Sequence, residues 1–276
     1  MAQESLWLGS YRKPCRQVMI ASIAITLALF AWLAVNRILF GEDAYGMHEM
    51  IRPAGKPLVL IMLLMVAWSL LVSAVYLSDW AVSIETPPDG LFDIVSLVCS
   101  RIAMIATAFI VVVMFYEVVS RYVFSRPTLW ANELSLWIAG FVFLLAGQYA
   151  MQQRCHIRIY IIYDMFPRWL QKICDLISTS LICLFTFAMI YGGYNDSMRR
   201  MLRMETFGTA WDPPLPGTLK PAILIIILAV TVQAVSNLIA DWNKEPGEHT
   251  PADDIDAEEI EKIKKTLGEE IGRAHV

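Results

Sequence analysis

The chain has 276 residues, of which 57% are hydrophobic and 17% are charged, and its formal net charge is −4. Soluble domains carry roughly a quarter charged residues, so this composition, with a mean hydropathy of +0.53, excludes an ordinary water-soluble enzyme. Acidic residues gather at the C-terminus, where residues 241–276 hold 11 acidic and 5 basic side chains. An acidic tail argues against nucleic acid or an anionic lipid surface as its partner.

Six apolar segments follow one another along the chain and predict an all-α, polytopic membrane protein. The first covers about 18–40 and follows three basic residues, but its apolar run is too long for a signal peptide. The second covers about 57–78. The turn cluster Pro87-Pro88-Asp89-Gly90 then separates these two helices from the rest, so we expect them to pack at the periphery.

The third segment differs from the others because its uncharged core, 102–116, is short. A helix over 91–122 would be about 48 Å long and must tilt strongly or project from the bilayer. Glu117 and Arg121 lie four residues apart near its end, in the order that favours an ion pair on one helix face. Snorkelling of both side chains to water is the alternative interpretation.

The last three segments cover about 134–153, 176–195 and 221–240, each with enough uncharged residues to cross ~30 Å of hydrocarbon. Gly140 and Gly147 lie on nearly one face of the fourth segment and predict a close-packing seam.

The connection between the fifth and sixth segments, 196–219, is predicted to be a loop. It contains three arginines and the run Trp211-Asp212-Pro213-Pro214-Leu215-Pro216, whose prolines argue against a regular helix. Lysine and arginine residues are divided almost evenly between the two ends of the spans, so charge alone leaves the orientation open.

Cysteine and histidine usage gives no sign of a metal or a cofactor. The five cysteines are an odd number without a close-spaced pair, which disfavours a disulfide framework or a zinc site. A haem-carrying bundle needs axial ligands inside its helices, and the four histidines do not supply them. We therefore expect neither a cofactor nor a metal.

Residues 117–170 are the most informative region. A helix opens near Trp130 after a bend that contains Pro127, and Glu133 falls in its first turn, where the helix dipole favours a carboxylate. We expect that Glu133 can face Arg121 or Arg126 across this bend and so fix two helices in register.

Beyond the fourth segment, Arg154, His156 and Arg158 predict a basic cluster where the helix leaves the membrane. The isoleucine-rich stretch 157–164 suits a segment that lies in the membrane interface. The chain is then expected to bend before Pro167.

The ordered set Arg121-Tyr122-Val123-Phe124, Pro127, Trp130, Glu133, Arg154, His156-Ile157 and Pro167 resembles the small membrane subunit of TRAP transporters, the DctQ-like small permeases. The resemblance covers roughly residues 92–241, and it lies in the order of the motifs on a four-helix hydropathy frame rather than in any one motif. It implies a tripartite, secondary active uptake system in the bacterial inner membrane, coupled to an ion such as sodium.

The resemblance also implies the roles of this chain and of its partners. A DctP-like periplasmic binding protein delivers the solute, a DctM-like large permease transports it, and this chain is a fixed scaffold that contacts the large permease and membrane lipid. No catalytic residue is implied. The residues that would be structural or make subunit contacts are Arg121, Phe124, Pro127, Trp130, Glu133, Arg154, His156 and Pro167.

The resulting domain organisation adds two helices to a four-helix core. The N-terminus, 1–17, and the acidic tail, 242–276, are expected in the cytoplasm. Residues 18–79 form the two extra spans, 80–91 a linker, and 92–241 the small-permease core.

The sequence differs from the family pattern in three ways, and two alternative functions are still open. Cys155 stands where the family has a glycine before the histidine, and the two extra helices and the acidic tail lie beyond the common core. An intramembrane enzyme could use only His156 with Asp164, beside Cys155, without the spacing of a nucleophile and its base. An accessory or assembly subunit of another membrane complex is the second alternative.

Overall fold

The computed structural model describes residues 5–41, 45–80, 85, 88, 90–154, 163 and 166–242. Within these ranges the chain forms helices and no strand, which confirms the all-α prediction. Six of the described helices are long and apolar enough to cross a membrane. They are α1 (Arg12–Phe40), α3 (Pro57–Ser78), α4 (Leu91–Tyr122), α5 (Ala131–Gln152), α7 (Arg168–Leu202) and α8 (Leu215–Asp241).

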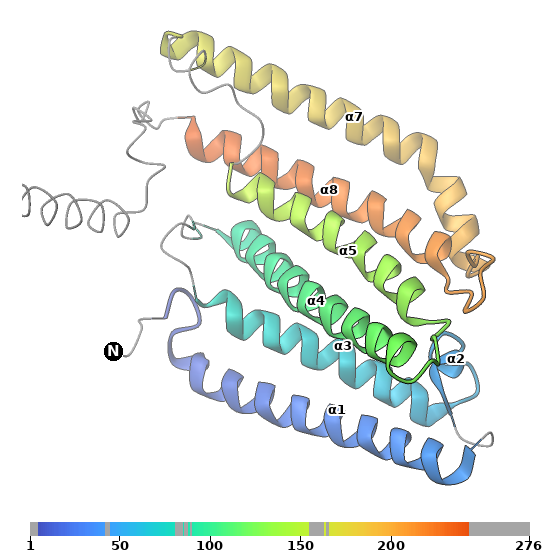
Figure 1. Ribbon diagram of the computed structural model, residues 1–276. Coiled ribbons are helices and arrows are strands. Elements are labelled where there is room, and N and C mark those ends of the chain that lie inside the picture. Colours follow the sequence, from blue (N-terminus) through green and yellow to red (C-terminus); the bar gives the residue numbers. More distant parts are fainter. Residues whose placement is uncertain are drawn as a thin grey trace, which may run out of the picture.

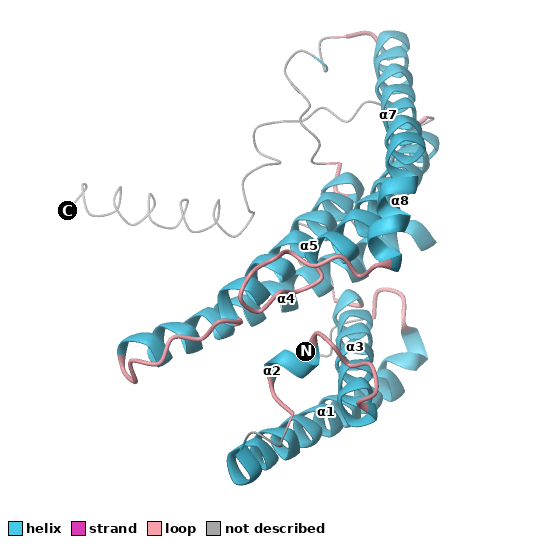
Figure 2. Cartoon of the chain, turned by 90° about the vertical axis from the view of Figure 1, so that its right-hand side faces the viewer, coloured by secondary structure: helices cyan, strands magenta, loops and turns pink. Residues whose placement is uncertain are grey.

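The six long helices lie side by side in a row, in the order α1, α3, α4, α5, α8, α7 (Figure 1). Each packs mainly on its neighbours in the row, so α1 and α7 form the two edges. A 3-10 turn, η1 (Gly9–Tyr11), precedes α1, and the short helix α2 (Met47–Met50) lies between α1 and α3. Seen from the side, α1 and α3 form a pair next to the group of α4, α5, α8 and α7 (Figure 2).

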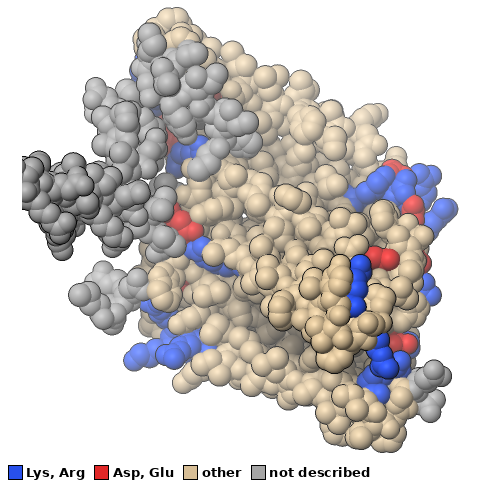
Figure 3. Space-filling view, in the orientation of Figure 1, with Lys and Arg blue, Asp and Glu red and all other residues tan. Residues whose placement is uncertain are grey.

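The row has two polar ends with an apolar belt between them. We call the end where α1, α4 and α7 begin the N-side, and the end where these helices finish the far side. On the face drawn in Figure 3, lysine, arginine, aspartate and glutamate side chains gather toward these two ends. Uncharged side chains cover the belt between them, as expected of spans that face hydrocarbon.

The structure extends two of the predicted helices. α7 has 35 residues and α8 has 27, so the predicted loop 196–219 shrinks to 203–214. The prediction was wrong at the start of α8 because Pro216 falls in the first turn of that helix, where the missing N–H would have no intrahelical partner anyway. α7 would measure about 52 Å, longer than the ~30 Å of hydrocarbon, so it must tilt or project.

The predicted glycine seam on α5 is only half correct. A Cβ atom added at Gly140 would lie 2.7 Å from Leu219 Cδ1 of α8, so the two helices do approach closely there. A Cβ atom added at Gly147 would meet nothing within 4 Å. The pair of glycines therefore marks one close approach and one open position.

The segment that precedes α1, residues 5–11, is anchored at the N-side by Asp79, the residue after α3. Its buried carboxylate accepts hydrogen bonds from the N–H groups of Trp7 and Leu8, both at 2.9 Å, and from Ser5 Oγ. Arg12 Nε lies 3.4 Å from Asp79 Oδ2. These contacts fasten the segment before α1 to the end of α3.

We predict that this anchor weakens in acid. Burial alone would raise the pKa of Asp79, but the hydrogen bonds from Leu8, Trp7 and Ser5 and the charge of Arg12 hold that pKa below its usual value. Because the folded-state pKa is depressed, the stabilisation is present above the ordinary value of about 3.9 and is lost as the pH falls through the folded-state pKa. Thermal unfolding in detergent should show a stability difference between wild type and Asp79→Asn at pH 7 that narrows below pH ~4. A difference that stays constant with pH would contradict this assignment.

Candidate functional site

The sequence motif falls into two groups, one at each end of the row. Glu117, Arg121, Phe124, Pro127, Trp130 and Glu133 lie at the far side, at the end of α4 and the start of α5. Arg154 and Pro167 lie at the N-side, after α5 and before α7. The predicted interfacial stretch 157–164 lies outside the described residues except for Tyr163, and so do His156 and the tail beyond residue 242.

Glu117 organises the bend between α4 and α5. Its side chain is 4% exposed, and it accepts hydrogen bonds from Arg121 Nε at 2.9 Å and from the Thr128 N–H at 3.0 Å. Thr128 Oγ1 also donates to the second carboxylate oxygen. Arg121 thus forms the i,i+4 pair with Glu117, while Thr128 closes the bend from its other end. Helical spacing does not predict the contact between Glu117 and Thr128, because Thr128 lies outside the helix.

The same bend contains three other motif residues, Phe124, Pro127 and Trp130. Ser125 adopts a left-handed conformation with φ 53°, and the Ser120 hydroxyl donates to the Arg126 carbonyl at 2.5 Å. Phe124 and Pro127 are exposed on the outside of the bend. Trp130 precedes α5 and stacks on Tyr116 of α4, with ring centroids 5.7 Å apart. The motif therefore builds a corner held by these contacts, with Phe124 and Pro127 exposed on its outside.

Glu133 has a different partner from the one predicted. Its carboxylate accepts hydrogen bonds from Thr209 Oγ1 at 2.6 Å and from the N–H groups of Trp211 at 3.4 Å and Asp212 at 3.2 Å. Among the described residues, no ion pair joins Glu133 to Arg121 or Arg126. The prediction was wrong because the connection between α7 and α8 folds back and offers backbone N–H groups to this carboxylate. We call this connection, residues 203–214, the α7–α8 loop.

Trp211 packs the α7–α8 loop against α2 and α5. Its side chain is 4% exposed, and its Nε1 donates to the Met47 carbonyl of α2 at 3.0 Å. The ring meets Trp137 of α5 edge-on at 6.5 Å, and Trp137 Nε1 donates to Thr218 Oγ1 of α8 at 2.8 Å. We call residues 18–79, with α1, α2 and α3, the extension. The Trp211 indole thus contacts both the extension, at α2, and the motif region, at α5.

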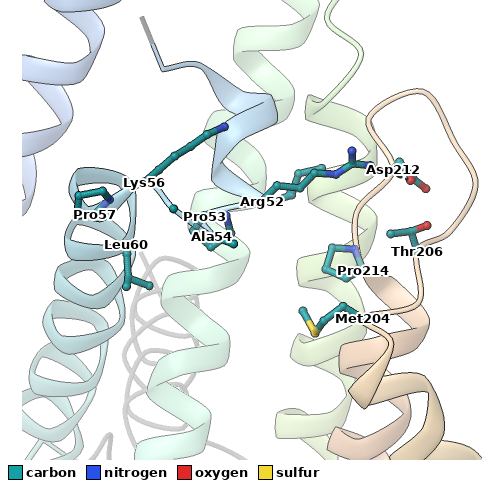
Figure 4. A pocket seen from close by; sticks show the side chains of 12 residues that line it. Arg52, Pro53, Ala54, Lys56, Pro57, Leu60, Met204, Thr206, Asp212 and Pro214 are labelled. Atoms are coloured by element: carbon teal, nitrogen blue, oxygen red, sulfur yellow. Dashed lines mark hydrogen bonds and ion pairs between the residues drawn. The ribbon is translucent and has the colours of Figure 1, made fainter.

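A groove of about 810 Å³ separates the extension from the α7–α8 loop at the far side (Figure 4). Arg52 reaches across it, and its Nη2 lies 3.4 Å from Asp212 Oδ2. Asp212 adopts φ 63° and accepts a hydrogen bond from the Gly208 N–H at 2.8 Å. That hydrogen bond, aided by Thr206, by the Arg52 charge and by the Thr209 N–H, lowers the pKa of Asp212. The carboxylate therefore remains ionised at neutral pH and holds the loop turn closed.

Charged side chains also join the end of α7 to the start of α8. Asp196 accepts from Arg199 at 2.8 Å, Arg200 at 3.0 Å and Lys220 at 2.5 Å, and Arg200 also contacts Glu205. The three arginines predicted to lie in a loop are thus at the end of α7 and just beyond it, where the helix dipole favours cations.

Gly217 allows the α7–α8 loop to lie against α8. A Cβ atom at this position would lie 2.9 Å from the Glu205 nitrogen and 3.1 Å from the Met204 carbonyl carbon, both backbone atoms. We predict that Gly217→Ala destabilises the protein by about 1–3 kcal/mol, the usual cost of overpacking. Thermal unfolding in detergent measures this, with Gly147→Ala as the matched control, because a methyl group there meets open space. Equal stability losses in the two variants would contradict the close approach.

At the N-side, Arg154 joins α5 to α8. Its guanidinium forms a two-point pair with Asp241, with N–O distances of 2.7 and 2.8 Å, and Arg168 Nη2 donates to the Asp241 carbonyl at 2.7 Å. Arg154 itself adopts φ 56°. Two-point arginine–carboxylate pairs are geometrically demanding, so this contact fixes how the chain leaves α5.

A buried polar chain links α4, α5 and α8 next to this pair. Gln148 Nε2 donates to Ser96 Oγ at 2.8 Å, and Ser96 Oγ donates to Gln233 Oε1 at 3.1 Å. Gln233 Nε2 donates to Asp93 at 2.6 Å and to Asn237 at 3.0 Å. Polar contacts of this kind hold helices together within a membrane, where the hydrophobic effect gives no preference between lipid and a neighbouring helix.

Arg101 connects the extension to the rest of the row. It is 5% exposed and forms a two-point pair with Glu85, with N–O distances of 2.5 and 2.9 Å. The guanidinium also donates to the Trp80 carbonyl at 2.8 Å, and Tyr149 of α5 donates to Glu85 at 2.8 Å. Arg101 directly precedes the uncharged core 102–116 of its helix. A cation at such a position within a span must find an acid, and this was the signal in the sequence for the contact.

The chemistry of these clusters is that of fixed contacts. In the described part of the chain, no group of three or more histidine, cysteine, aspartate or glutamate side chains gathers to hold a metal ion. Glu117, Glu133 and Asp241 accept hydrogen bonds from backbone N–H groups, threonines or arginines of neighbouring elements. The carboxylates thus hold helices and loops in place.

Comparison with known proteins agrees with the motif. Residues 110–244 match the family described as "Tripartite ATP-independent periplasmic transporters, DctQ component". The chain is also similar to the C4-dicarboxylate TRAP transporter small permease protein DctQ of Vibrio cholerae serotype O1, at 23% identity over 106 residues. That match covers 38% of this chain and 45% of the relative, so the chain spans less than half of the length of the relative it matches. No solved structure matches the chain.

The matched region begins within α4 and takes in α5, α7 and α8, while α1, α2 and α3 precede it. It contains the bend at Glu117, the Glu133 contacts and the pair between Arg154 and Asp241. This family is a component of transporters rather than a family of enzymes. Residues 110–244 are thus similar to the DctQ-like small permeases of TRAP transporters.

Proposed function

We propose that this chain scaffolds the large permease subunit of a TRAP transporter in the bacterial inner membrane. The match of residues 110–244 to the DctQ family carries the proposal. The contacts at both ends of the row support it, because a scaffold must hold its shape while its partner moves. At the far side Glu133 fastens the α7–α8 loop to α5, and at the N-side Arg154 fastens α5 to α8.

We infer that the partners divide the remaining tasks. A DctM-like large permease would carry the solute and sodium sites, and a DctP-like periplasmic binding protein would deliver the solute. Ion and solute sites in secondary transporters typically use broken helices with polar groups at midplane. α3 and α5 are each one continuous helix, and α3 contains no charged residue. This composition supports a carrier path in the partner rather than in this chain.

The orientation that we propose places the N-side in the cytoplasm and the far side in the periplasm. Six spans put residue 5 and residue 242 on the same side of the membrane. The α7–α8 loop and α2 would then face the periplasm together.

The motif residues take structural roles in this proposal. Arg121 and Glu133 shape the far-side corner, and Phe124 and Pro127 are exposed there for contact with a partner. Arg154 holds the N-side. Trp130, His156 and Pro167 are proposed as further structural or contact residues.

Reconstituted transport tests the proposal. Proteoliposomes would contain the large permease with or without this chain, the binding protein would be loaded with solute outside, and uptake would be followed with and without an inward sodium gradient. We expect uptake only when both membrane subunits are present, and we expect it to follow the sodium gradient. Equal uptake by the large permease alone would contradict the scaffold role, and uptake that ignores sodium would contradict the coupling.

A further inference from the structure

An apolar groove of about 820 Å³ lies where the extension meets the DctQ-like region. It is separate from the groove in Figure 4. Its walls come from α1, α4 and the start of α5, and the chain around α2 closes its far-side end. Leu33 of α1 and Val113 of α4 lie at its floor, 4% and 6% exposed. The extension therefore supplies the larger part of this groove, and α4 and the start of α5 supply the rest.

The length and position of the groove match one leaflet of a bilayer. It runs from Phe30 to Ile38 on α1 and from Phe109 to Tyr116 on α4. Eight residues of helix measure about 12 Å, which is close to half of the ~30 Å hydrocarbon core. The groove ends near the far-side ends of both helices, where that leaflet meets the polar headgroups. Its depth is thus that of a single layer of acyl chains.

The rim of the groove carries the residue types that favour the membrane interface. Arg37, Tyr45, Tyr116 and Trp130 line its far-side end. Tryptophan and tyrosine concentrate at headgroup depth, and a long basic side chain near a helix end reaches toward phosphates. Below this rim the lining consists of aliphatic side chains and phenylalanine. The groove is therefore polar at its far-side end and apolar toward the middle of the membrane, as is a phospholipid of that leaflet.

We propose that this groove binds one phospholipid of the far-side leaflet, with an acyl chain between α1 and α4 and its phosphate at the rim beside Arg37. An empty apolar groove at hydrocarbon depth would forfeit dispersion contacts along both walls, and a lipid chain can enter it sideways from the bilayer. The bound lipid fills the seam between the extension and the DctQ-like region.

A matched pair of variants tests this site. Val112 and Val111 are neighbours on α4 with exposed fractions of 64% and 63%, but only Val112 lines the groove. Val112→Trp fills the groove with an indole, whereas Val111→Trp adds the same indole beside it. The full chain, together with the membrane partner that copurifies with it, would be extracted in mild detergent and analysed by native mass spectrometry for bound phospholipid. Delipidated samples would then be supplemented with a phosphatidylethanolamine carrying 16- to 18-carbon chains, and thermal unfolding would be recorded.

We expect one retained phospholipid per chain in wild type and in Val111→Trp, and an occupancy about tenfold lower in Val112→Trp. Added lipid should raise the melting temperature of the first two proteins and leave that of Val112→Trp unchanged. Equal lipid retention in the two variants would overturn the proposal. Loss of a membrane partner from Val112→Trp, with no lipid found in wild type, would also overturn it and assign the groove to a protein contact.

Discussion

Replacing Arg101 by alanine is expected to destabilise the protein by about 3–5 kcal/mol, because it leaves the buried carboxylate of Glu85 without its cation. The same change removes the hydrogen bond to the Trp80 carbonyl at the end of α3. Denaturant titration in mixed micelles measures the loss. We also expect the extension to detach from α4, which cysteine cross-linking between α3 and α4 would show.

Two controls separate this expectation from a general loss of charge. Arg199→Ala removes an arginine whose side chain is 62% exposed, and exposed ion pairs contribute only about 0–1 kcal/mol. The double replacement Arg101→Met with Glu85→Leu should recover most of the stability, because a buried pair can be exchanged for apolar packing. A loss in Arg101→Ala no larger than that in Arg199→Ala would show that the pair does not join the extension to the row.

Glu133→Ala is expected to release the α7–α8 loop and to weaken assembly with the large permease. Hydrogen bonds to a charged group contribute about 1.5–3 kcal/mol each, and this carboxylate accepts three, from Thr209, Trp211 and Asp212. Recovery of the partner in a pull-down should fall severalfold, while uptake per assembled complex should remain close to that of wild type.

Glu133→Gln is the matched control, because its amide oxygen still accepts hydrogen bonds from the loop. We expect this variant to assemble better than Glu133→Ala. Normal assembly combined with lost uptake in Glu133→Ala would contradict the scaffold role and would indicate that Glu133 takes part in transport itself.

Hydropathy was enough to predict the six spans and the all-α fold, because a lipid-facing helix must be apolar over its length. The ordered motif around Arg121, Trp130 and Glu133 was enough to predict the DctQ family, which the match to residues 110–244 confirms. Helix ends were less predictable. Arg199 lies beyond the apolar run of its segment and Pro216 is typical of loops, yet one lies at the end of α7 and the other in the first turn of α8.

The partners of the charged residues could not be predicted in the same way. The Glu117–Arg121 pair follows from the geometry of one helix. Glu85 and Arg101, or Glu133 and Asp212, are brought together only by the packing of separate elements. No periodicity in the sequence predicts such contacts. The cost of a buried charge indicates that each charged residue has a partner, but it does not indicate which residue that partner is.

These long-range contacts change the role expected of the two extra helices. The extension lies at one edge of the row, in line with the expected periphery, but it is joined to the rest at both ends. Arg101 holds it at the N-side, and Trp211 reaches α2 at the far side. We therefore propose that the extension is a fixed part of the scaffold rather than a flexible addition.

The proposed scaffold role requires that this chain binds a large permease in the membrane. The tagged chain would be extracted in mild detergent, pulled down through its C-terminal tail, and the recovered proteins identified and counted by mass spectrometry. We expect a much larger polytopic permease in stoichiometric amounts. A chain that is recovered alone, stable and monodisperse would contradict the scaffold role.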